Sequence, residues 1–269
     1  RRAAAAVDDA RERIAAVLGA EPREIVFTSG ATESNNLAIL GWAEAQPRRR
    51  HLVTVATEHP SVLDTCRALT SRGFELTELA VDSNGLVSLD AVAAAIRDDT
   101  FLVSVMAANN EIGVLQPIRE IATLCHDRQV AFHTDAAQAI GKIPIEAGGM
   151  GLDLLSVSGH KIYGPKGIGL LRVRRSGSPR LTLEPRQYGG GHEGGLRSGT
   201  LPVASIVGLA RALEICLEER EAEGIRLATL RDRLCKEIEA ALPGRVLVNG
   251  DESRRLAGNL NLSFEGVDG

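Results

Sequence analysis

The sequence predicts an α/β fold in three layers, a mainly parallel sheet with helices on both faces, followed by the beginning of a smaller α+β C-terminal domain. Three observations lead to this prediction. Strand-like and helix-like segments alternate from residue 24 to residue 174, as in repeated βαβ units. The strands are almost continuously apolar, as expected for strands buried on both faces. After Pro202 the alternation gives way to a long amphipathic stretch, so we divide the chain into 1–218 and 219–269.

Turn residues set the boundaries of the elements in the larger part. Residues 1–19 carry apolar side chains at helical spacing, and Gly30 then ends the first strand and opens the next helix. Gly73 marks the end of a further helix, and the turn DSNG at 82–85 precedes another. The expected strands are 24–30, 51–57, 75–81, 101–109, 130–136, 152–159 and 168–174. The expected helices are 1–19, 31–45, 61–73, 88–99 and 118–129.

The C-terminal part predicts two helices within 203–242 that meet near Gly224, followed by strand-like stretches at 245–250 and 259–264. The last stretch is expected to lack a partner strand, because the sequence stops soon after it. Residue 1 already lies inside a helical pattern and is not methionine. We therefore expect both ends to belong to a longer protein.

The composition excludes several classes of protein. A net charge of −4 lacks the clustered cations that bind nucleic acid or an anionic membrane surface. No apolar run approaches the roughly 18 residues of a membrane-spanning helix. The four cysteines are widely spaced and lie in helical patterns, which indicates small buried side chains under reducing conditions rather than a metal site or disulfides. We expect a cytoplasmic protein without a metal centre.

Polar residues follow the predicted parallel strands, where ligands bind in open sheets. After the first strand, the Gly30 turn opens a helix at Ala31 and Thr32, and the backbone amides of a helix start can bind a phosphate. His59 follows the second strand and Asn110 follows a later one. Each of these signals alone is as often an ordinary cap or turn residue.

Two charged residues at this edge need partners. Asp135 ends a buried strand, with Gln138 three residues later, and an unpaired carboxylate there would be costly. Lys161 stands between Ser158-Gly159-His160 and a glycine-rich turn, where desolvation can make its amine nucleophilic. Lysine is also the residue that forms Schiff bases.

Together these residues meet the needs of pyridoxal phosphate. That cofactor requires a lysine for its aldehyde, an acid for its ring nitrogen, a cradle for its phosphate and a flat face for its ring. Lys161, Asp135, the SGAT turn at 29–32 with Ser158 and His160, and the imidazole of His59 supply them. Their occurrence at successive strand ends is a much stronger signal than any one of them.

Two apparent nucleotide-binding motifs lack residues or elements that such motifs require. The GGGHEGG segment at 189–195 contains a formal GxGxxG pattern, but no helix follows it. In the GxxxxG pattern from Gly159 to Gly164, the position that a phosphate-binding loop requires to be lysine is Pro165.

The chain resembles the pyridoxal-phosphate-dependent cysteine desulfurases that supply sulfur for iron–sulfur clusters. The resemblance covers essentially the whole sequence and is carried by EIVFTSGATESNNLAI, TEHPSVLDTC, NNEIGVLQPI, HTDAAQAIGK, SGHKIYGPKGIG and GGGHEGGLRSGTLP. It implies the large domain of a fold type I pyridoxal phosphate enzyme, a homodimer, and a cofactor bound near the subunit interface.

The resemblance also implies roles for particular residues. Lys161 would form the Schiff base with the cofactor and move protons during catalysis, and Asp135 would bind the ring nitrogen. His59 would stack on the ring and act as an acid or base. Asn110 and Gln138 would contact the substrate or the ring oxygen.

Further residues would hold the phosphate of the cofactor. Those of the same subunit are Ala31, Thr32, Ser158 and His160. Thr200 would reach the phosphate bound by the neighbouring subunit, which would make dimerisation part of the active site.

In the family, L-cysteine loses its sulfur to an enzyme thiolate, leaving alanine and an enzyme persulfide that passes sulfur to an acceptor protein. The four cysteines here do not match the motif of that thiolate, so we expect the nucleophilic cysteine, and the arginine that binds the substrate carboxylate, beyond Gly269. Two other functions stay open. One is a related aminotransferase or selenocysteine lyase, which would differ in its products, and the other is a non-catalytic scaffold subunit, which would not bind the cofactor.

Overall fold

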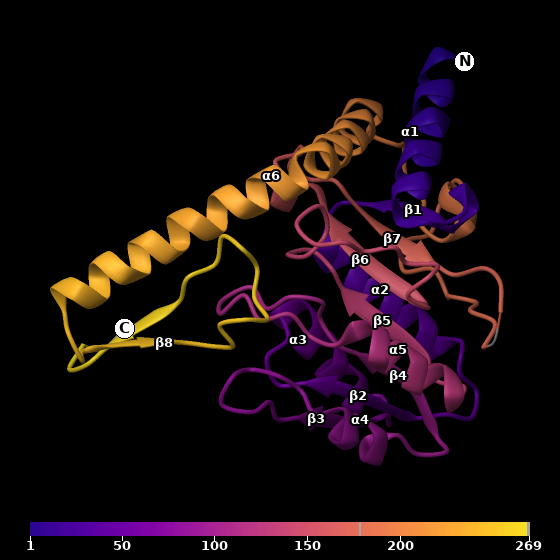
Figure 1. Ribbon diagram of the computed structural model, residues 1–269. Coiled ribbons are helices and arrows are strands. Elements are labelled where there is room, and N and C mark those ends of the chain that lie inside the picture. The colour runs from indigo at the N-terminus through magenta and orange to yellow at the C-terminus, as the bar shows by residue number, and fades with distance from the viewer. Residues whose placement is uncertain (178, 268–269) are drawn as a thin grey trace.

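The computed structural model describes residues 1–177 and 179–267, and its centre is a seven-stranded sheet with the order β1-β7-β6-β5-β4-β2-β3 (Figure 1). Only β7 runs antiparallel to its neighbours, β1 and β6, and the other pairings are parallel. This confirms the prediction of a mainly parallel sheet. The strands are β1 Ile25–Thr28, β2 His51–Val55, β3 Glu75–Leu79, β4 Thr100–Ser104, β5 Ala131–Asp135, β6 Leu154–Ser158 and β7 Gly169–Val173.

Helices cover both faces of the sheet, which gives the predicted three layers. One apolar core joins the sheet to α2 and α3, and a second joins it to α1, α4, α5 and the first part of α6. The helices are α1 Arg2–Leu18, α2 Ala31–Glu44, α3 Pro60–Thr70, α4 Leu89–Ala95, α5 Ile118–Asp127 and α6 Val203–Ala241.

The apolar strands supply both cores at once. Along β6, Leu154 packs in the core with α2, whereas Leu155 and Val157 pack in the core with α1 and α5. Successive side chains of a strand point to opposite faces of the sheet, so every second residue serves one core. Burial on both faces is the physical reason why these strands read as continuous apolar runs.

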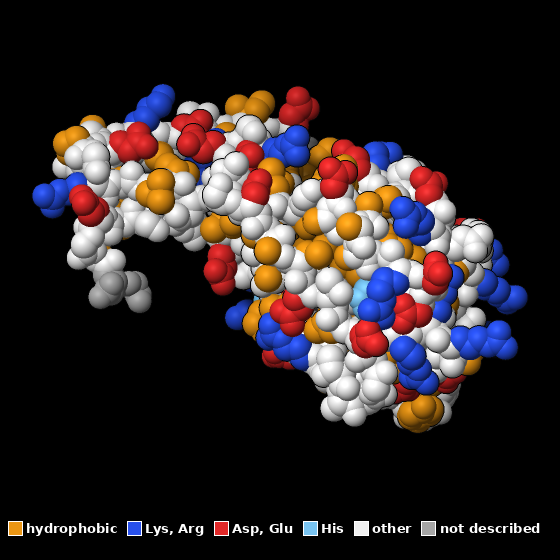
Figure 2. All heavy atoms as spheres, turned by 90° about the horizontal axis from the view of Figure 1, so that it is seen from below, with side chains coloured by type: hydrophobic (Ala, Val, Ile, Leu, Met, Phe, Trp, Pro, Cys, Tyr) orange, Lys and Arg blue, Asp and Glu red, His pale blue; other side chains and the backbone are white. Residues whose placement is uncertain are grey.

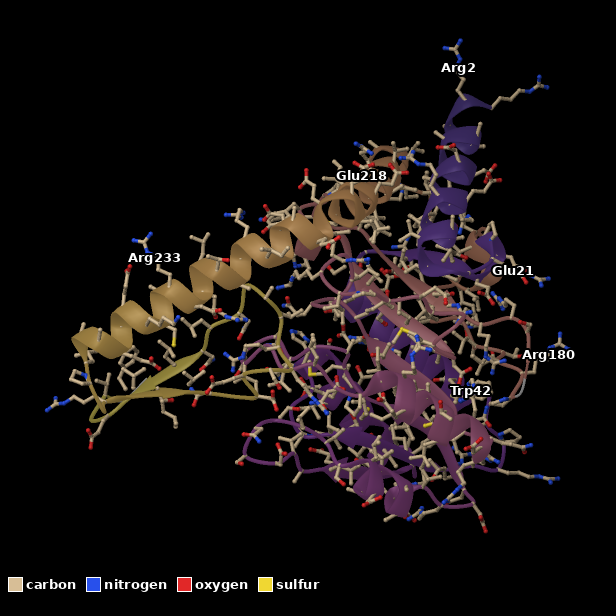
Figure 3. All side chains as sticks on the ribbon, viewed as in Figure 1. Arg2, Glu21, Trp42, Arg180, Glu218 and Arg233 are labelled. Atoms are coloured by element: carbon tan, nitrogen blue, oxygen red, sulfur yellow. The ribbon has the colours of Figure 1, made fainter. Side chains whose placement is uncertain are left out.

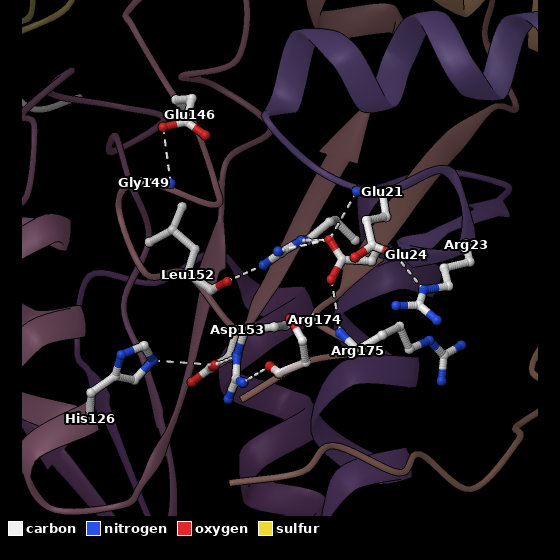
Figure 4. A network of polar contacts seen from close by, with 12 residues as sticks. Glu21, Arg23, Glu24, His126, Glu146, Gly149, Leu152, Asp153, Arg174 and Arg175 are labelled. Carbon is white, nitrogen blue, oxygen red and sulfur yellow. Dashed lines mark hydrogen bonds and ion pairs between the residues drawn. The ribbon is translucent and has the colours of Figure 1, made fainter. Parts of the chain in front are cut away.

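A buried carboxylate fastens the antiparallel strand at the edge of the sheet where the parallel strands begin. Asp153, just before β6, is fully buried and accepts a hydrogen bond of 2.8 Å from the backbone N–H of Phe132. It is also bound by the guanidinium of Arg174, which follows β7, and by His126 Nε2 at 3.3 Å (Figure 4). The hydrogen bond to Asp153 raises the pKa of His126. Three donors therefore offset the cost of burying this charge.

The expectation of two helices after Pro202 is wrong, because α6 is a single helix from Val203 to Ala241. Gly224 lies inside it, and an ion pair of 2.8 Å between Glu223 and Arg226 spans the glycine. A glycine in a helix interior costs only about 1 kcal/mol relative to alanine, which the many other helix-forming residues of this segment outweigh.

The second half of α6 projects from the body as an arm (Figure 1), with Arg233 on the projecting part (Figure 3). Its fully buried residues, Ile206 to Leu213, all lie in the first half. Hydrophobic side chains are exposed along the arm (Figure 2). Ile225 and Leu234 are among the exposed residues of this part of α6. These observations support our proposal that a second domain begins near residue 219, within the helix.

The arm carries a two-stranded antiparallel sheet made of β8 (Val246–Val248) and β9 (Leu262–Phe264). The expectation that the last strand lacks a partner is therefore wrong. The preceding strand folds back against it, and Asn249 Nδ2 donates to Asn261 Oδ1 at 2.8 Å beside the pair. In the part of the chain that the structure describes, no helix is long and apolar enough to span a lipid bilayer.

Candidate active site

The ends of β1 and β6 are held together by the antiparallel strand between them. Gly169, the first residue of β7, pairs with Thr28 at the end of β1 and with Ser158 at the end of β6. A Cβ atom at Gly169 would lie 2.4 Å from the carbonyl oxygen of Val157 and 2.6 Å from Cα of Gly30. Only glycine permits this approach, so the turn after β1 is packed directly against the start of β7, beside the end of β6.

That turn forms a cradle of the kind that binds anions. Gly30 has φ 153° and ψ −178°, a conformation that essentially only glycine adopts, and no side chain of the described residues caps the start of α2. Ala31 and Thr32 begin the helix, where backbone N–H groups and the helix dipole favour a negative charge. The hydroxyl of buried Ser158 faces the turn, 3.8 Å from the position of a Cβ at Gly30.

Two further groups complete the surroundings of the cradle. His160 Nδ1 lies 2.9 Å from Ser158 Oγ, so two of the predicted phosphate residues are in hydrogen-bond contact at the end of β6. Glu33, in the first turn of α2, would repel an anion, but it is paired with Arg197 at 2.8 Å and accepts the N–H of Ser29 at 2.7 Å. The pairing with Arg197 offsets the unfavourable charge of Glu33.

Asp135 is a buried carboxylate at the end of the central strand β5, with 6% of its surface exposed. Its Oδ1 accepts the backbone N–H of Ala137 at 2.8 Å, and its Oδ2 accepts Nδ2 of Asn35 at 2.7 Å. Burial raises the pKa of Asp135, an effect that these hydrogen bonds and the nearby charges of His59 and Lys161 partly offset. The site thus holds a carboxylate that a cationic ligand would stabilise.

A chain of hydrogen bonds connects Asp135 with His59. Asn35 Nδ2, which binds Asp135, also donates to Ser61 Oγ at 2.9 Å. Ser61 Oγ lies 2.8 Å from His59 Nδ1, and the backbone N–H of Ser61 donates to the same nitrogen at 3.1 Å. His59 is the N-cap of α3, so the helix start fixes its ring. The sequence-predicted acid and the predicted ring-stacking residue therefore belong to one network.

Lys161 lies on a short 3₁₀ turn (Gly159–Ile162) that directly follows β6. This placement confirms that the lysine stands at the same edge of the sheet as Asp135. Its side chain is exposed, so the desolvation expected for it is not found in the described residues. The physical reason is its position on a surface turn, beyond the buried end of the strand.

Asn110 and Gln138 line a cavity of about 810 Å³ between the strand ends and α6. Lys142 Nζ donates to Gln138 Oε1 at 3.2 Å in the wall of this cavity. Desolvation lowers the pKa of Lys142, and the charge of Lys161 adds to this effect. Ile162, on the same turn as Lys161, also lines the cavity, so the cavity adjoins the lysine turn. A smaller hollow of about 420 Å³ is lined by Thr32 and His59.

Thr200 stands apart from the other predicted site residues. It lies exposed just before α6 and, among the described residues, makes no hydrogen bond to another member of the predicted set. The loop before it is anchored on the first strand, because Glu193 accepts the backbone N–H of Phe27 at 2.7 Å and pairs with Arg11 at 2.6 Å. The loop is therefore fixed to the body although Thr200 itself faces solvent.

Three residues of the site were not predicted from the sequence: Asn35, Ser61 and Gly169. Asn35 lies one helical turn after Ala31, so helical spacing could have placed it on the face of α2 that meets the sheet. Ser61 is two residues after His59, a spacing at which a cap side chain and a backbone N–H meet. No local signal identifies Gly169, because its role depends on a contact with Gly30, far away in the sequence.

The whole chain, residues 1–269, matches the model of the class-V aminotransferase family. Cysteine desulfurase IscS of Tolumonas auensis is 53% identical over 268 residues, which are 98% of this chain and 65% of that protein. The human cysteine desulfurase is 52% identical over 266 residues, which are 98% of this chain and 58% of that protein. The chain thus spans less than two thirds of the length of these relatives.

Solved structures of related proteins share the fold of this chain. DndA from Streptomyces lividans superimposes with a TM-score of 0.92 at 44% identity, over 100% of this chain and 75% of that chain. SspA, solved in complex with cysteine, superimposes with a TM-score of 0.85 at 41% identity, over 98% of this chain and 73% of that chain. The family match over every residue and the shared fold show that this chain belongs to the class-V aminotransferases, a family of pyridoxal-phosphate-dependent enzymes.

Proposed function

We propose that the protein is a cysteine desulfurase, which removes sulfur from L-cysteine and releases L-alanine. The observation that carries the proposal is the arrangement of a buried carboxylate, an anion cradle and a lysine at one edge of the sheet, formed by Asp135, the Gly30 turn and Lys161. The identity of more than half of the aligned residues to cysteine desulfurases supports this reaction over other reactions of the family.

The donor set fits pyridoxal phosphate. In the described part of the chain, Asp135 forms no ion pair with a lysine or arginine, although its carboxylate is buried. A protonated pyridine nitrogen is a cation of suitable size and shape for that position. The start of α2 offers backbone N–H groups without a side-chain cap, which suits a phosphate.

Named residues would hold the cofactor. Asp135 would bind the ring nitrogen, His59 would stack on the ring, and Gln138 with Asn110 would contact the ring oxygen or the substrate. The phosphate would be held by a set of residues at the cradle, Ala31, Thr32, Ser158 and His160. Thr200, exposed and apart from this set, suits a contact to the phosphate of a second subunit in a homodimer.

Pyridoxal phosphate supplies an aldehyde that captures an amine and a ring that withdraws electrons from the substrate. Lys161 Nζ would hold that aldehyde in the resting protein and would move the proton of the substrate Cα during the reaction. Asp135 would keep the ring nitrogen protonated, which sustains the electron withdrawal. The exposure of Lys161 leaves its amine accessible to both tasks.

In the proposed reaction, the sulfur of L-cysteine must be transferred to a thiolate of the enzyme. A thiolate that attacks the cysteine sulfur forms an S–S bond, the C–S bond breaks, and its electron pair stays on Cβ, which takes up a proton to give alanine. Burial raises the pKa of the Cys66 and Cys125 thiols, and desolvation also raises that of Cys216. We propose that none of these thiols is the acceptor, because the thiolate is the reactive form.

The persulfide would pass its sulfur to an acceptor protein for iron–sulfur cluster assembly or thiolation, in the cytoplasm. The test is the formation of L-alanine from L-cysteine by the full-length protein with pyridoxal phosphate. Lys161→Ala should abolish alanine formation, whereas Lys166→Ala, an exposed lysine in the same loop, should retain it. Formation of pyruvate or of a transaminated product in place of alanine would contradict the proposal and favour a related enzyme.

A further inference from the structure

The hydrogen-bond chain between Asp135 and His59 has a fixed direction. Each oxygen of an ionised carboxylate only accepts, so the atom of Asn35 that faces Asp135 Oδ2 must be the NH₂ group. An amide nitrogen has two hydrogens, and the second one goes to Ser61 Oγ. The charge on Asp135 therefore determines which way the Asn35 amide is turned.

The direction continues through Ser61 to the imidazole. Because Ser61 Oγ accepts from Asn35, its own hydrogen is available for the nearest acceptor, His59 Nδ1, at 2.8 Å. The backbone N–H of Ser61 is also directed at Nδ1. A hydrogen on Nδ1 would oppose that N–H, so Nδ1 must present its lone pair.

We propose that Asn35 and Ser61 are positioning residues that hold neutral His59 in the tautomer with its hydrogen on Nε2, in response to the charge on Asp135. His59 then offers an N–H donor from its other ring nitrogen and cannot take up a proton there. This assigns His59 a role as a hydrogen-bond donor and stacking face, rather than as a base. The role given to His59 rests on the proposed function. The tautomer of His59 does not depend on that function, because it follows from hydrogen bonds within this chain.

Burial makes Asn35 well suited to this task. The residue is fully buried, so its amide cannot turn toward solvent when the charge on Asp135 changes. Its Oδ1 is buried without a hydrogen-bond partner among the described residues, a cost that the two hydrogen bonds of Nδ2 offset. Asn36, the next residue, instead donates to the carbonyl of Thr32 at 2.9 Å and takes no part in the chain.

Nitrogen NMR of the cofactor-free, full-length protein with ¹⁵N-labelled histidine tests the tautomer directly. The signals of His59 are assigned by their loss in His59→Gln. In the neutral ring, we expect an unprotonated Nδ1 and a protonated Nε2. The reverse pattern overturns the proposal, and because no cofactor or substrate is present, its failure is distinct from failure of the proposed function.

Two pairs of variants test the role of the hydrogen-bond chain. Ser61→Ala removes the hydroxyl and leaves the backbone N–H, so we expect the minor tautomer of His59 to rise about tenfold, the effect of one hydrogen bond. Ser61→Thr keeps a hydroxyl and should restore the wild-type ratio. Asn35→Ala should raise the minor tautomer in the same way, and Asn36→Ala should not.

The outcomes decide the proposal even if one variant does not fold. If Asn35→Ala is unfolded, the Ser61 pair carries the test, because Ser61 is only half-buried and its substitution disturbs the fold less. A wild-type tautomer ratio in Ser61→Ala contradicts the role of the hydroxyl. A folded Asn35→Ala protein with the wild-type ratio contradicts the link to Asp135.

Discussion

The carboxylate of Asp135 accepts a hydrogen bond of 2.7 Å from the side-chain amide of Asn35, and both residues are buried. A neutral amide can orient this carboxylate but cannot neutralise it. The fold therefore keeps an anion at the end of its central strand that a bound cation would stabilise. This relationship implies that the site is built for ligand binding at the expense of the stability of the cofactor-free protein.

Asp135→Asn should accordingly have opposite effects on stability and on cofactor binding. In the cofactor-free protein we expect a higher urea midpoint at pH 7 than in the wild type, because burial disfavours the charged carboxylate. Pyridoxal phosphate should bind about 10- to 100-fold more weakly, since a hydrogen bond to a charged group is lost. Urea unfolding and fluorescence titration measure the two effects, and a variant that is both less stable and equally tight in binding would contradict the assignment.

Glu58 should make the protein less stable as the pH rises. Its carboxyl is buried, Oε1 accepts the N–H of Met106, and Oε2 has no partner among the described residues. Burial raises the pKa of Glu58 well above its usual range, and the nearby charge of Asp135 adds to this. The folded protein therefore keeps a proton that the unfolded chain releases, so stability is lost from the unfolded pKa of about 4.3 upward until the folded pKa is reached.

Glu58→Gln removes this titration while keeping the shape of the protonated acid. Relative to the wild type, the variant should gain up to about 1.4 kcal/mol in free energy of unfolding for each pH unit within that window. Urea unfolding of both proteins between pH 5 and pH 8 gives the difference. A difference that does not change with pH would show that Glu58 is ionised in the folded protein.

His126 should have a pH dependence confined to a different range. Its pKa is raised first by the hydrogen bond to Asp153, so the protonated ring stabilises the folded protein. That contribution is complete below the unfolded pKa of about 6.5 and is lost as the pH rises through the higher folded value. His126→Gln should therefore be less stable than the wild type at pH 5.5 and should approach it at pH 9. An equal melting temperature of the two proteins at pH 5.5 would argue against the ion pair.

Gly169→Ala should destabilise the fold and loosen the anion cradle. The added Cβ would meet backbone atoms of Val157 and Gly30, which cannot move aside as a flexible side chain can. We expect a loss of about 3 kcal/mol or more in the free energy of unfolding. Gly224→Ala is the matched control, because none of the described atoms lies within 4 Å of its Cβ position in the middle of α6. This variant should be more stable by about 0.5–1 kcal/mol.

The sequence predicted the large domain well because its signals are local. Apolar strands and glycine turns fix where each element begins, and the seven strands of the main sheet all form near their expected ranges. The expectation of two helices after Pro202 was wrong because it gave too much weight to one glycine. Gly224 suggested a break in the helix, but helix formation over the whole segment outweighs a single glycine.

The sequence predicted the residues of the candidate site that lie at strand ends. It did not predict the residues that connect them by hydrogen bonds. Asp135 and Ser158 end buried strands and Lys161 follows one, so their shared edge of the sheet is a consequence of the topology. Asn35 and Ser61 join that edge through contacts between α2, α3 and β5, and such contacts depend on how helices pack rather than on sequence spacing. The exposure of Lys161 is likewise a property of the folded surface.

The most direct test of the central claim is the intact mass of the full-length protein after borohydride reduction with pyridoxal phosphate. We predict one covalent pyridoxyl adduct per chain in the wild type and in Lys166→Ala, and none in Lys161→Ala. Such a result establishes Lys161 as the residue that binds the cofactor at the edge of the sheet formed by Asp135 and Ser158. An adduct that persists in Lys161→Ala, or a wild-type protein without any adduct, would contradict the account.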